Sequence, residues 1–344
     1  MRRRFLDAMT LVQEDGRPDI FLLMTCNPNW KEIVDELLPG QTAQDRPDLV
    51  ARVFRAKLED LKVQLLKMNF IGEVGAHVYV VEFQKRGLPH AHFLLIMRPR
   101  HKITNPDDYD KIVCAEISDP IKYPAMHDLV KNHMIHGTCG SLREKSPCME
   151  GVPKKCRFRW VAPYNPKLRM MFNYHIKVEV CLSIKSVKYI FKYVYKGHDK
   201  HVIHIDQDRE NNTINEIRRF QDACYVCPPE AMWQIFSFPL SQIHPYVMSL
   251  KIHPSNQQLV RFKDGDRMED IVERENDKNS MLMEFFEKNK EDSNARKYMY
   301  KDFLKKFTWN SSTHRWSPRK QKSMIGRLVY ANPIEGERYY LRLL

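Results

Sequence analysis

The segment AHVYVVEFQKRGLPHAHFLLIM (residues 76–97) holds the pattern that decides the fold. Two runs rich in β-branched and aromatic residues, 76–84 and 90–97, stand on either side of the short linker KRGLP. Two such runs joined by a few residues that include glycine are typical of an antiparallel β-hairpin. The sequence therefore predicts a pair of adjacent strands here.

Four side chains of this hairpin could bind a cation. Side chains alternate across a strand, so His90 and His92 share one face of the second strand. Glu82 and Gln84 share one face of the first strand for the same reason. Neighbours across a strand pair are in contact, so the hairpin can place Glu82 or Gln84 beside the two histidines.

The regions around the hairpin predict an α+β fold in which helices flank a central antiparallel sheet. DIFLLMTCN (19–27) is a continuous apolar run, as expected of a central strand buried on both faces. Residues 47–68 repeat apolar side chains with a helical period and predict a long amphipathic helix. Residues 99–170 show little periodicity beyond a helix near 124–135, so we expect an irregular insertion rich in Cys and His.

The charge of the chain points to a polyanionic partner. Fifty-six Lys and Arg against 43 Asp and Glu give 344 residues a net charge of +13, which favours nucleic acid. Cations alternate with aromatic residues in PKKCRFRW (153–160) and KSVKYIFKYVYKGHDKH (185–201), a composition that suits phosphate neutralisation and base stacking. The candidate DNA-binding residues are Lys154, Lys155, Arg157, Arg159, Lys188 and Lys200. The longest apolar run, IFLLM, is too short to cross a bilayer, so we expect a soluble intracellular protein without a membrane partner.

The segment SVKYIFKYVYKG (186–197) predicts a helix that ends at Gly197. Positions i, i+3, i+4 and i+7 of one face are occupied by Tyr189, Lys192, Tyr193 and Lys196. The opposite stripe is aliphatic and suits burial. A surface helix whose tyrosines merely cover apolar neighbours is the simpler alternative.

These side chains together suit the transfer of a phosphoryl group. A phenol is a poor nucleophile at neutral pH because its pKa is near 10. Lysines on the same helix face favour the phenolate and neutralise a phosphate, and a divalent metal held by His90 and His92 would polarise a phosphoryl oxygen. We therefore expect a transesterase in which tyrosine attacks a DNA phosphorus, a 5′-phosphotyrosine forms and a 3′ hydroxyl leaves.

The eight cysteines favour reduced thiols or metal ligation over disulfides, because nothing else in the sequence suggests secretion. A structural zinc site of three cysteines and one histidine is one interpretation of the insertion, with His136, Cys139, Cys148 and Cys156 as ligands and His133 nearby. The spacing lacks a C-x₂-C pair. Thiols that simply pack in an irregular segment are the alternative.

Several motifs resemble the replication-initiator domain of Helitron transposases, which are HUH endonucleases. FLLMTCNPNW (21–30) is similar to the first motif of that family, and VEFQKRGLPHAHFLL (81–95) to its metal motif. The stretch from Arg159 to Asp199 resembles the two-tyrosine region, and ERYYLRLL (337–344) resembles the junction that precedes a helicase. The resemblance spans nearly the whole chain.

The resemblance implies cutting and joining of single-stranded DNA at transposon ends during rolling-circle transposition. It places Mg²⁺ or Mn²⁺ on His90 and His92, with the third ligand on the EFQ strand. Gln84 is favoured because a polar residue follows the same Phe in related initiators, while the charge of Glu82 would bind the cation more strongly than an amide. The nucleophiles map to Tyr189 and Tyr193, with Lys192 and Lys196 as supporting cations. Tyr195 lies off their helix face and is expected to pack.

The resemblance also implies the domain organisation. We expect a nuclease domain at 1–205 with a Cys/His-rich insertion at 116–165, and a mixed α/β extension at 206–344 that leads toward a helicase. The sequence contains no G-x-x-x-x-G-K-[ST] phosphate loop, so this chain alone should not hydrolyse ATP. A nuclear location is expected, and the oligomeric state is left open. The alternatives are a plasmid or viral rolling-circle initiator and a non-catalytic module that binds single-stranded DNA.

Overall fold

The structure is a computed structural model of the chain. It describes residues 2–83, 87–134, 149–150, 155–156, 161–181, 226–255, 257–258, 260, 265, 267–270, 279–320 and 324–343, with the backbone alone at 149–150 and 155–156. Two compact units divide the chain: unit 1 comprises Met1–Phe5 and Asp15–Gln242, and unit 2 comprises Leu6–Glu14 and Ile243–Leu344. The domain boundary expected after residue 205 falls outside the described residues and stays a prediction.

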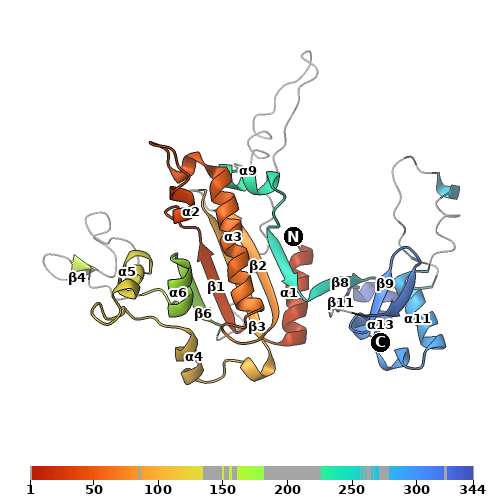
Figure 1. The fold of residues 1–344 in the computed structure, drawn as a ribbon. Coiled ribbons are helices and arrows are strands. Elements are labelled where there is room, and N and C mark those ends of the chain that lie inside the picture. Colours follow the sequence, from red (N-terminus) through yellow and green to blue (C-terminus); the bar gives the residue numbers. More distant parts are fainter. Residues whose placement is uncertain are drawn as a thin grey trace, which may run out of the picture. The chain divides into compact units, whose positions relative to one another are not determined.

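Unit 1 is built on a five-stranded antiparallel sheet, which confirms the predicted α+β class (Figure 1). The strand order is β6-β1-β3-β2-β7. The bounds of these strands are Ile20–Thr25 for β1, Val74–Phe83 for β2, Pro89–Met97 for β3, Ile176–Val180 for β6 and Ser241–His244 for β7. The inner position of β1, between β6 and β3, agrees with the apolar run from which a central strand was predicted.

The predicted hairpin is confirmed as β2 and β3, which pair antiparallel with Glu82 opposite His90 and Val80 opposite His92. Gly87 in the linker adopts a φ of +82°, a left-handed conformation that glycine accepts without strain. All nine residues of β3 are buried. The strand that carries the two histidines therefore lies in the interior of unit 1.

Helix α3 (Pro47–Leu66) covers one face of this sheet (Figure 1). Its start at Pro47 suits the first helical turn, where the missing N–H of proline is not needed. The periodic apolar residues predicted from the sequence are its buried side: Leu49, Val50, Ala51, Phe54, Leu58, Leu61 and Leu65. They join Ile20, Leu22 and Met24 of β1 and Phe93 and Leu95 of β3 in one core. Burial of each large apolar side chain contributes roughly 1.5–3 kcal/mol, so this face stabilises the fold.

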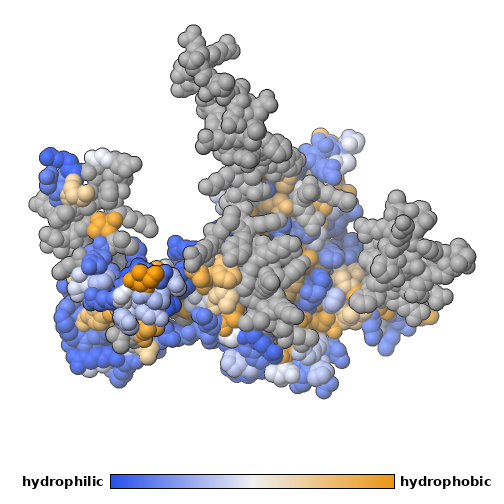
Figure 2. Space-filling view, turned by 180° about the vertical axis from the view of Figure 1, so that it is seen from behind, coloured by the Kyte–Doolittle hydropathy of each residue, from blue (hydrophilic) through white to orange (hydrophobic). Residues whose placement is uncertain are grey.

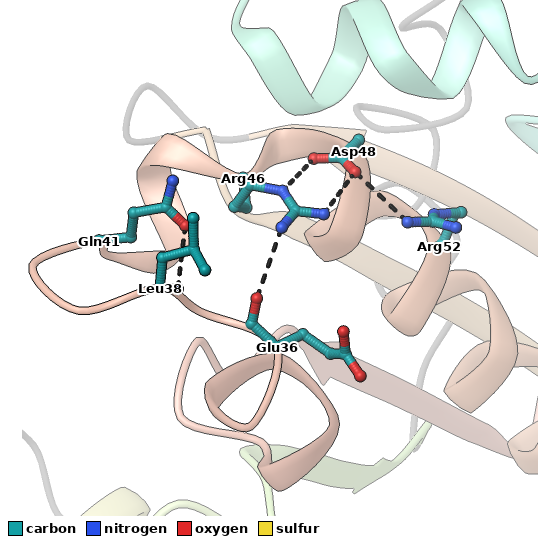
Figure 3. A network of polar contacts seen from close by, with 6 residues as sticks. All are labelled: Glu36, Leu38, Gln41, Arg46, Asp48 and Arg52. Carbon is teal, nitrogen blue, oxygen red and sulfur yellow. Dashed lines mark hydrogen bonds and ion pairs between the residues drawn. The ribbon is translucent and has the colours of Figure 1, made fainter.

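A small polar network holds the start of α3 (Figure 3). Arg46 donates to both carboxylate oxygens of Asp48, at 3.0 Å each, and to the carbonyl oxygen of Glu36 at 3.4 Å. Arg52, one turn further on, donates to Asp48 at 3.3 Å. The hydrogen bond from Arg46 is the main reason that the pKa of Asp48 lies below its ordinary value.

Three α-helices lie in the described part of the region expected to be irregular, between 99 and 170. Helix α5 (Pro124–His133) confirms the one predicted near 124–135. Helices α4 (Pro106–Ile112) and α6 (Pro166–Phe172) were not predicted, so the expectation of irregular structure is wrong there. Each is short and begins with an Asn-Pro pair whose asparagine side chain accepts a backbone N–H of the first turn. The sequence feature that identifies these two helices is the capping asparagine at the start of each, and not a periodic apolar pattern.

The remaining elements of unit 1 are short. Helix α9 (Pro228–Ile235) packs against α3, where Trp233 lies 6.0 Å from Phe54 between ring centroids. The others are α2 (Lys31–Val34), the 3₁₀ turns η1 (Ala43–Asp45) and η2 (Pro99–His101), and the strand pair β4 (Met149–Glu150) and β5 (Lys155–Cys156). The side of the sheet away from α3 is visible in Figure 2, where hydrophobic residues of unit 1 appear between grey atoms.

Unit 2 has its own core and confirms that the C-terminal part is mixed α/β. Strands β8 (Tyr246–Leu250) and β11 (Met324–Leu328) pair in parallel, and β9 (Phe307–Asn310) pairs antiparallel with β10 (Arg315–Pro318). Phe303 stacks on Phe307 at 4.2 Å between centroids and meets the edge of Trp316. The other elements are α11 (Met281–Glu291), η3 (Ala295–Lys297), α12 (Tyr300–Phe303), η4 (Pro333–Glu335) and α13 (Glu337–Leu343).

The first helix of the chain, α1 (Arg2–Asp15), belongs mainly to unit 2. Within that unit, Asp7 of α1 accepts a hydrogen bond from Nε of Arg327 in β11 at 2.8 Å. Leu11 is fully buried. The hydrogen bond thus joins segments of unit 2 that are far apart in the sequence. Among the described residues, no helix has the length and apolar character needed to cross a membrane.

Candidate active site

A row of polar side chains crosses the sheet where β3 begins. His90 of β3 pairs with Thr25 of β1 on one side and with Glu82 of β2 on the other. The backbone N–H of Thr25 donates to the carbonyl oxygen of His175 at 3.1 Å, which extends the row to the residue before β6. The row therefore runs His175, Thr25, His90, Glu82. Side chains that are directly opposite point to the same face, so these four share one environment.

His92 lies on the same face as His90, two residues further along β3. Its Nε2 atom is 3.5 Å from Oε2 of Glu82, and its ring stacks on Phe21 with centroids 5.9 Å apart. Only 6% of His90 and 8% of His92 is exposed. The shared face expected from the alternation of the strand is confirmed, and Glu82 lies beside both histidines.

His90 is held by a neighbour on β1. Its Nδ1 atom is 2.9 Å from Oγ1 of Thr25, and Nδ1 of His175 approaches the same oxygen at 3.4 Å. The Nε2 atom of His90 is buried and has no hydrogen-bond partner among the described residues. A proton on Nδ1 that is donated to Thr25 leaves a lone pair on Nε2, which is the arrangement that metal-binding histidines adopt.

Two of the three histidines have strongly lowered pKa values. The pKa of His90 is lowered to about 4, mainly by burial and then by His92 and His175, against an opposing effect of Glu82. The pKa of His175 is also lowered to about 4, again mainly by burial and then by Arg169. Both imidazoles are therefore neutral at neutral pH. A neutral imidazole is the form that binds a metal.

The described donors fit part of a metal site. Among the residues that the structure describes, no group of three or more His, Cys, Asp and Glu side chains is arranged to hold a metal ion. The buried, unpartnered Nε2 of His90 nevertheless has the chemistry of a ligand, and Glu82 supplies oxygen atoms close by. Gln84, the favoured third ligand, lies outside the described residues. Imidazole nitrogen and carboxylate or amide oxygen together suit a divalent cation.

Most other residues singled out in the sequence lie outside the described part of the chain. This holds for the predicted nucleophiles and their cations, Tyr189, Lys192, Tyr193 and Lys196. It holds equally for the zinc candidates His136, Cys139 and Cys148, and for the DNA-binding candidates Lys154, Arg157, Arg159, Lys188 and Lys200. Cys156 and Lys155 form β5 and are described by their backbone alone. Their assignments stay predictions.

Four cysteine side chains are described, and none of them forms a disulfide: Cys26, Cys114, Cys181 and Cys227. Three of them are buried, and Cys114 is partly exposed. Burial strongly raises the pKa of the Cys26 thiol. A buried thiol with a raised pKa is protonated and unreactive, so Cys26 is a packing residue. The expectation of reduced thiols for the eight cysteines stays a prediction.

Sequence analysis missed Thr25 and His175 as members of the row. Both lie within stretches that resemble family motifs, but neither was assigned a role. The alternation in NYHIKVEV (173–180) predicts a strand in which His175 and Lys177 lie on the same face. The pairing partner of that strand could not be deduced from the sequence, because the pairing of β6 with β1 spans about 150 residues of intervening chain. That partner is what brings His175 to Thr25.

The fold and the row define an α+β protein with buried, neutral histidines at the start of a central antiparallel strand. Comparison with known families agrees with this. A family model described as "Helitron helicase-like domain at N-terminus" matches residues 1–95, a range that includes β1, α3, β2 and His90 and His92 of β3. This region of the chain is thus similar to a Helitron-associated domain. No curated protein matches the chain.

Proposed function

We propose that this protein is the single-stranded DNA endonuclease and strand transferase of a rolling-circle, Helitron-type transposase. The observation that carries the proposal is the buried row, in which the Nε2 atom of His90 lacks a partner beside His92 and Glu82. The family match over residues 1–95 supports it, because the matched segment contains both histidines. The net charge of +13 suits a nucleic-acid substrate.

In the proposed reaction, the phenol oxygen of Tyr189 or Tyr193 attacks the scissile phosphorus of single-stranded DNA. A bond forms between this oxygen and phosphorus, the bond from phosphorus to the 3′ oxygen breaks, and the phenol proton ends on the released 3′ hydroxyl. Lys192 and Lys196 favour the phenolate and neutralise the phosphate. A 3′ hydroxyl of another strand reverses the step and joins the ends.

His90 and His92 would hold a divalent cation, Mg²⁺ or Mn²⁺, with Gln84 as the favoured third ligand and Glu82 as the alternative. When bound, the cation supplies charge that polarises a phosphoryl oxygen. Thr25 fixes the ring of His90, and burial keeps that ring neutral and able to bind. These residues bind and orient, whereas the tyrosines carry the covalent chemistry.

The proposal extends to the partners of the protein. The DNA partner would be single-stranded transposon ends, contacted by the cations at 153–160 and 185–201. A helicase domain of a longer protein and a nuclear location follow from the transposase context. A zinc site formed by His136, Cys139, Cys148 and Cys156 would organise the insertion.

The experiment is a cleavage assay on a labelled single-stranded oligonucleotide with Mn²⁺, scored for a covalent protein–DNA adduct. Wild-type protein should form the adduct, and the double variant Tyr189→Phe, Tyr193→Phe should form none. Tyr195→Phe is the matched control, since its phenol lies off the predicted helix face, and it should behave as wild type. An adduct on the double variant, mapped by mass spectrometry to another residue, contradicts the assignment. A wild-type protein that binds the strand but never forms the adduct is a non-catalytic binding module.

A further inference from the structure

A groove of about 710 Å³ opens in unit 1 next to the row of histidines. This amide groove lies between the segment after β1 and the helices α5 and α6. Four of its lining side chains are carboxamides: Asn27, Asn29, Asn132 and Asn173. His133 also lines it, and Asp128 is the one acidic residue among the described lining residues. Its volume falls in the range of roughly 300–1,000 Å³ that is usual for ligand sites.

The amide groove and the row of histidines are joined directly. Asn27 follows Thr25 by two residues, and Asn173 precedes His175 by two residues. The side-chain nitrogen of Asn27 donates to the carbonyl oxygen of Asn173 at 3.1 Å. Two residues of extended chain span roughly 7 Å. If a phosphate of single-stranded DNA is bound at His90, the neighbouring nucleotide therefore lies within reach of the groove.

A buried arginine adds positive charge behind the groove. Arg169 of α6 is fully buried, and within the described residues its guanidinium makes one hydrogen bond, from Nη2 to the carbonyl oxygen of Leu129, a groove residue, at 2.6 Å. Its Nε and Nη1 atoms are buried and have no partner in that part of the chain. Burial lowers the pKa of this guanidinium to about 10, so it stays charged at neutral pH.

No carboxylate balances this charge within the described residues. The phenols of Tyr164 and Tyr174 lie near Arg169, but burial raises the pKa of both, so they carry no negative charge at neutral pH. Arg169 in turn lowers the pKa values of both His133 in the groove and His175 in the row. A buried cation without a counter-ion costs several kcal/mol, and a nearby anionic ligand would offset that cost. A phosphodiester in the groove meets this requirement.

The carboxamides suit the bases of such a ligand. Asn29 and Asn132 are exposed, and their side chains make no hydrogen bond within the described ranges. A carboxamide presents a donor and an acceptor side by side, which matches the edge of an adenine or another base. Unpaired bases expose those edges, whereas paired bases hide most of them.

We propose that the amide groove binds the unpaired nucleotide adjacent to the scissile phosphate, with Asn29 and Asn132 on the edge of its base and Arg169 attracting its phosphate. The groove would then set the base preference of the enzyme at that position. The position of the bound nucleotide next to the cleaved bond rests on the proposed function. The recognition of an unpaired base does not, because it depends only on the residues of the groove.

The test is a binding selection that needs no cleavage. The full chain captures oligonucleotides from a random single-stranded library in EDTA, and the bound fraction is sequenced. We expect wild-type protein to enrich particular bases at one or two adjacent positions. The double variant Asn29→Ala, Asn132→Ala should lose that enrichment and bind the preferred sequence about tenfold more weakly, in line with the contribution of base-edge contacts. Gln44→Ala removes an exposed carboxamide of unit 1 that does not line the groove, and it should change nothing.

Arg169 provides a second, independent readout. Arg169→Met should weaken binding of all sequences alike and reduce its dependence on salt, because it removes a charge and no base contact. If this variant fails to fold, the double asparagine variant still decides the question. A flat wild-type profile, or an unchanged base preference in the double asparagine variant, overturns the inference. Absence of a covalent adduct in Mn²⁺ instead overturns the proposed function and leaves the base preference to be judged by itself.

Discussion

The two faces of the central sheet in unit 1 are built from the same strands but differ in chemistry. The face under α3 is filled by Leu22, Phe93, Leu95 and the buried side of the helix. The opposite face carries the row from His175 to Glu82, which is almost as deeply buried. Apolar side chains gain from burial wherever they lie, whereas a buried imidazole loses its charged form. One face therefore stabilises the fold, and the other keeps a few groups neutral and ready to bind.

The largest expected effect is a loss of nicking activity on substitution of the histidines of the sheet face opposite α3. His90→Ala or His92→Ala should lower the rate of Mn²⁺-dependent nicking by at least ~1000-fold, equivalent to about 4 kcal/mol in the barrier, because the cation loses a ligand. Binding of single-stranded DNA should change little, since phosphate contacts are spread over many cations. Nicking is measured on a labelled oligonucleotide, and binding by fluorescence anisotropy. Full nicking by either variant in Mg²⁺ would refute the metal assignment.

On the face under α3, a large effect is expected on stability and none on activity. Phe54 is fully buried there, close to Trp233. Phe54→Ala should lower the free energy of unfolding by roughly 3–5 kcal/mol, because it leaves a cavity in a close-packed core. Urea denaturation monitored by circular dichroism measures this loss. The protein that remains folded should nick at the normal rate. A selective loss of nicking would show that the two faces are not separable.

A smaller effect is expected from the residue that orients His90. Thr25→Val keeps the shape of the side chain but removes the oxygen that lies 2.9 Å from Nδ1. Loss of such a supporting hydrogen bond typically costs 10- to 100-fold in metal affinity or activity. We expect Thr25→Val to need a roughly 10- to 100-fold higher Mn²⁺ concentration for half-maximal nicking. Thr25→Ser retains a hydroxyl and should recover most of the activity. Equal behaviour of the two variants would mean that the hydroxyl does not position the ring.

The smallest expected effect lies in the network at the start of α3. The pKa of Asp48 is lowered chiefly by its hydrogen bond from Arg46. A lowered carboxyl pKa contributes stability that is present above the ordinary pKa and is lost as the pH falls through the folded value. Asp48→Asn should therefore reduce stability slightly at neutral pH and flatten its decline below about pH 4. Solvent reaches about a third of each side chain of the pair, 30% of Arg46 and 32% of Asp48, and screens the interaction, so the change is small. Acid titrations of thermal unfolding compare the variant with wild type, and nicking at neutral pH should be unaffected.

The elements that the sequence predicted correctly are those whose pattern is long and local. The period of α3 and the two runs of the hairpin each extend over several turns or residue pairs, and so does the apolar run of β1. Helices α4 and α6 have seven residues each, too few to establish a period. Their Asn105-Pro106 and Asn165-Pro166 pairs favour a turn as readily as a helix start, and only the hydrogen bond to the third helical N–H distinguishes the two.

In the candidate site, too, the residues that could be predicted are those placed by a local pattern. His90, His92 and Glu82 could be placed on common faces because they belong to one hairpin. Thr25 and His175 could not, since their positions depend on pairing between strands that are distant in the sequence. Arg169 was missed because burial of a cation is contrary to its usual preference for the surface. Only the tertiary structure brings it behind the groove.

The membership of α1 in unit 2 has a consequence for how the chain is made. Leu6–Glu14 are synthesised well before their partners from Ile243 onward, and the hydrogen bond between Asp7 and Arg327 spans 320 positions. At a synthesis rate of about 5–20 residues per second, this amphipathic segment waits on the order of tens of seconds with Leu11 exposed. During that interval unit 1 can complete its sheet. Until residues 243–344 have been synthesised, this segment therefore lacks its native partners and offers a chaperone a place to bind.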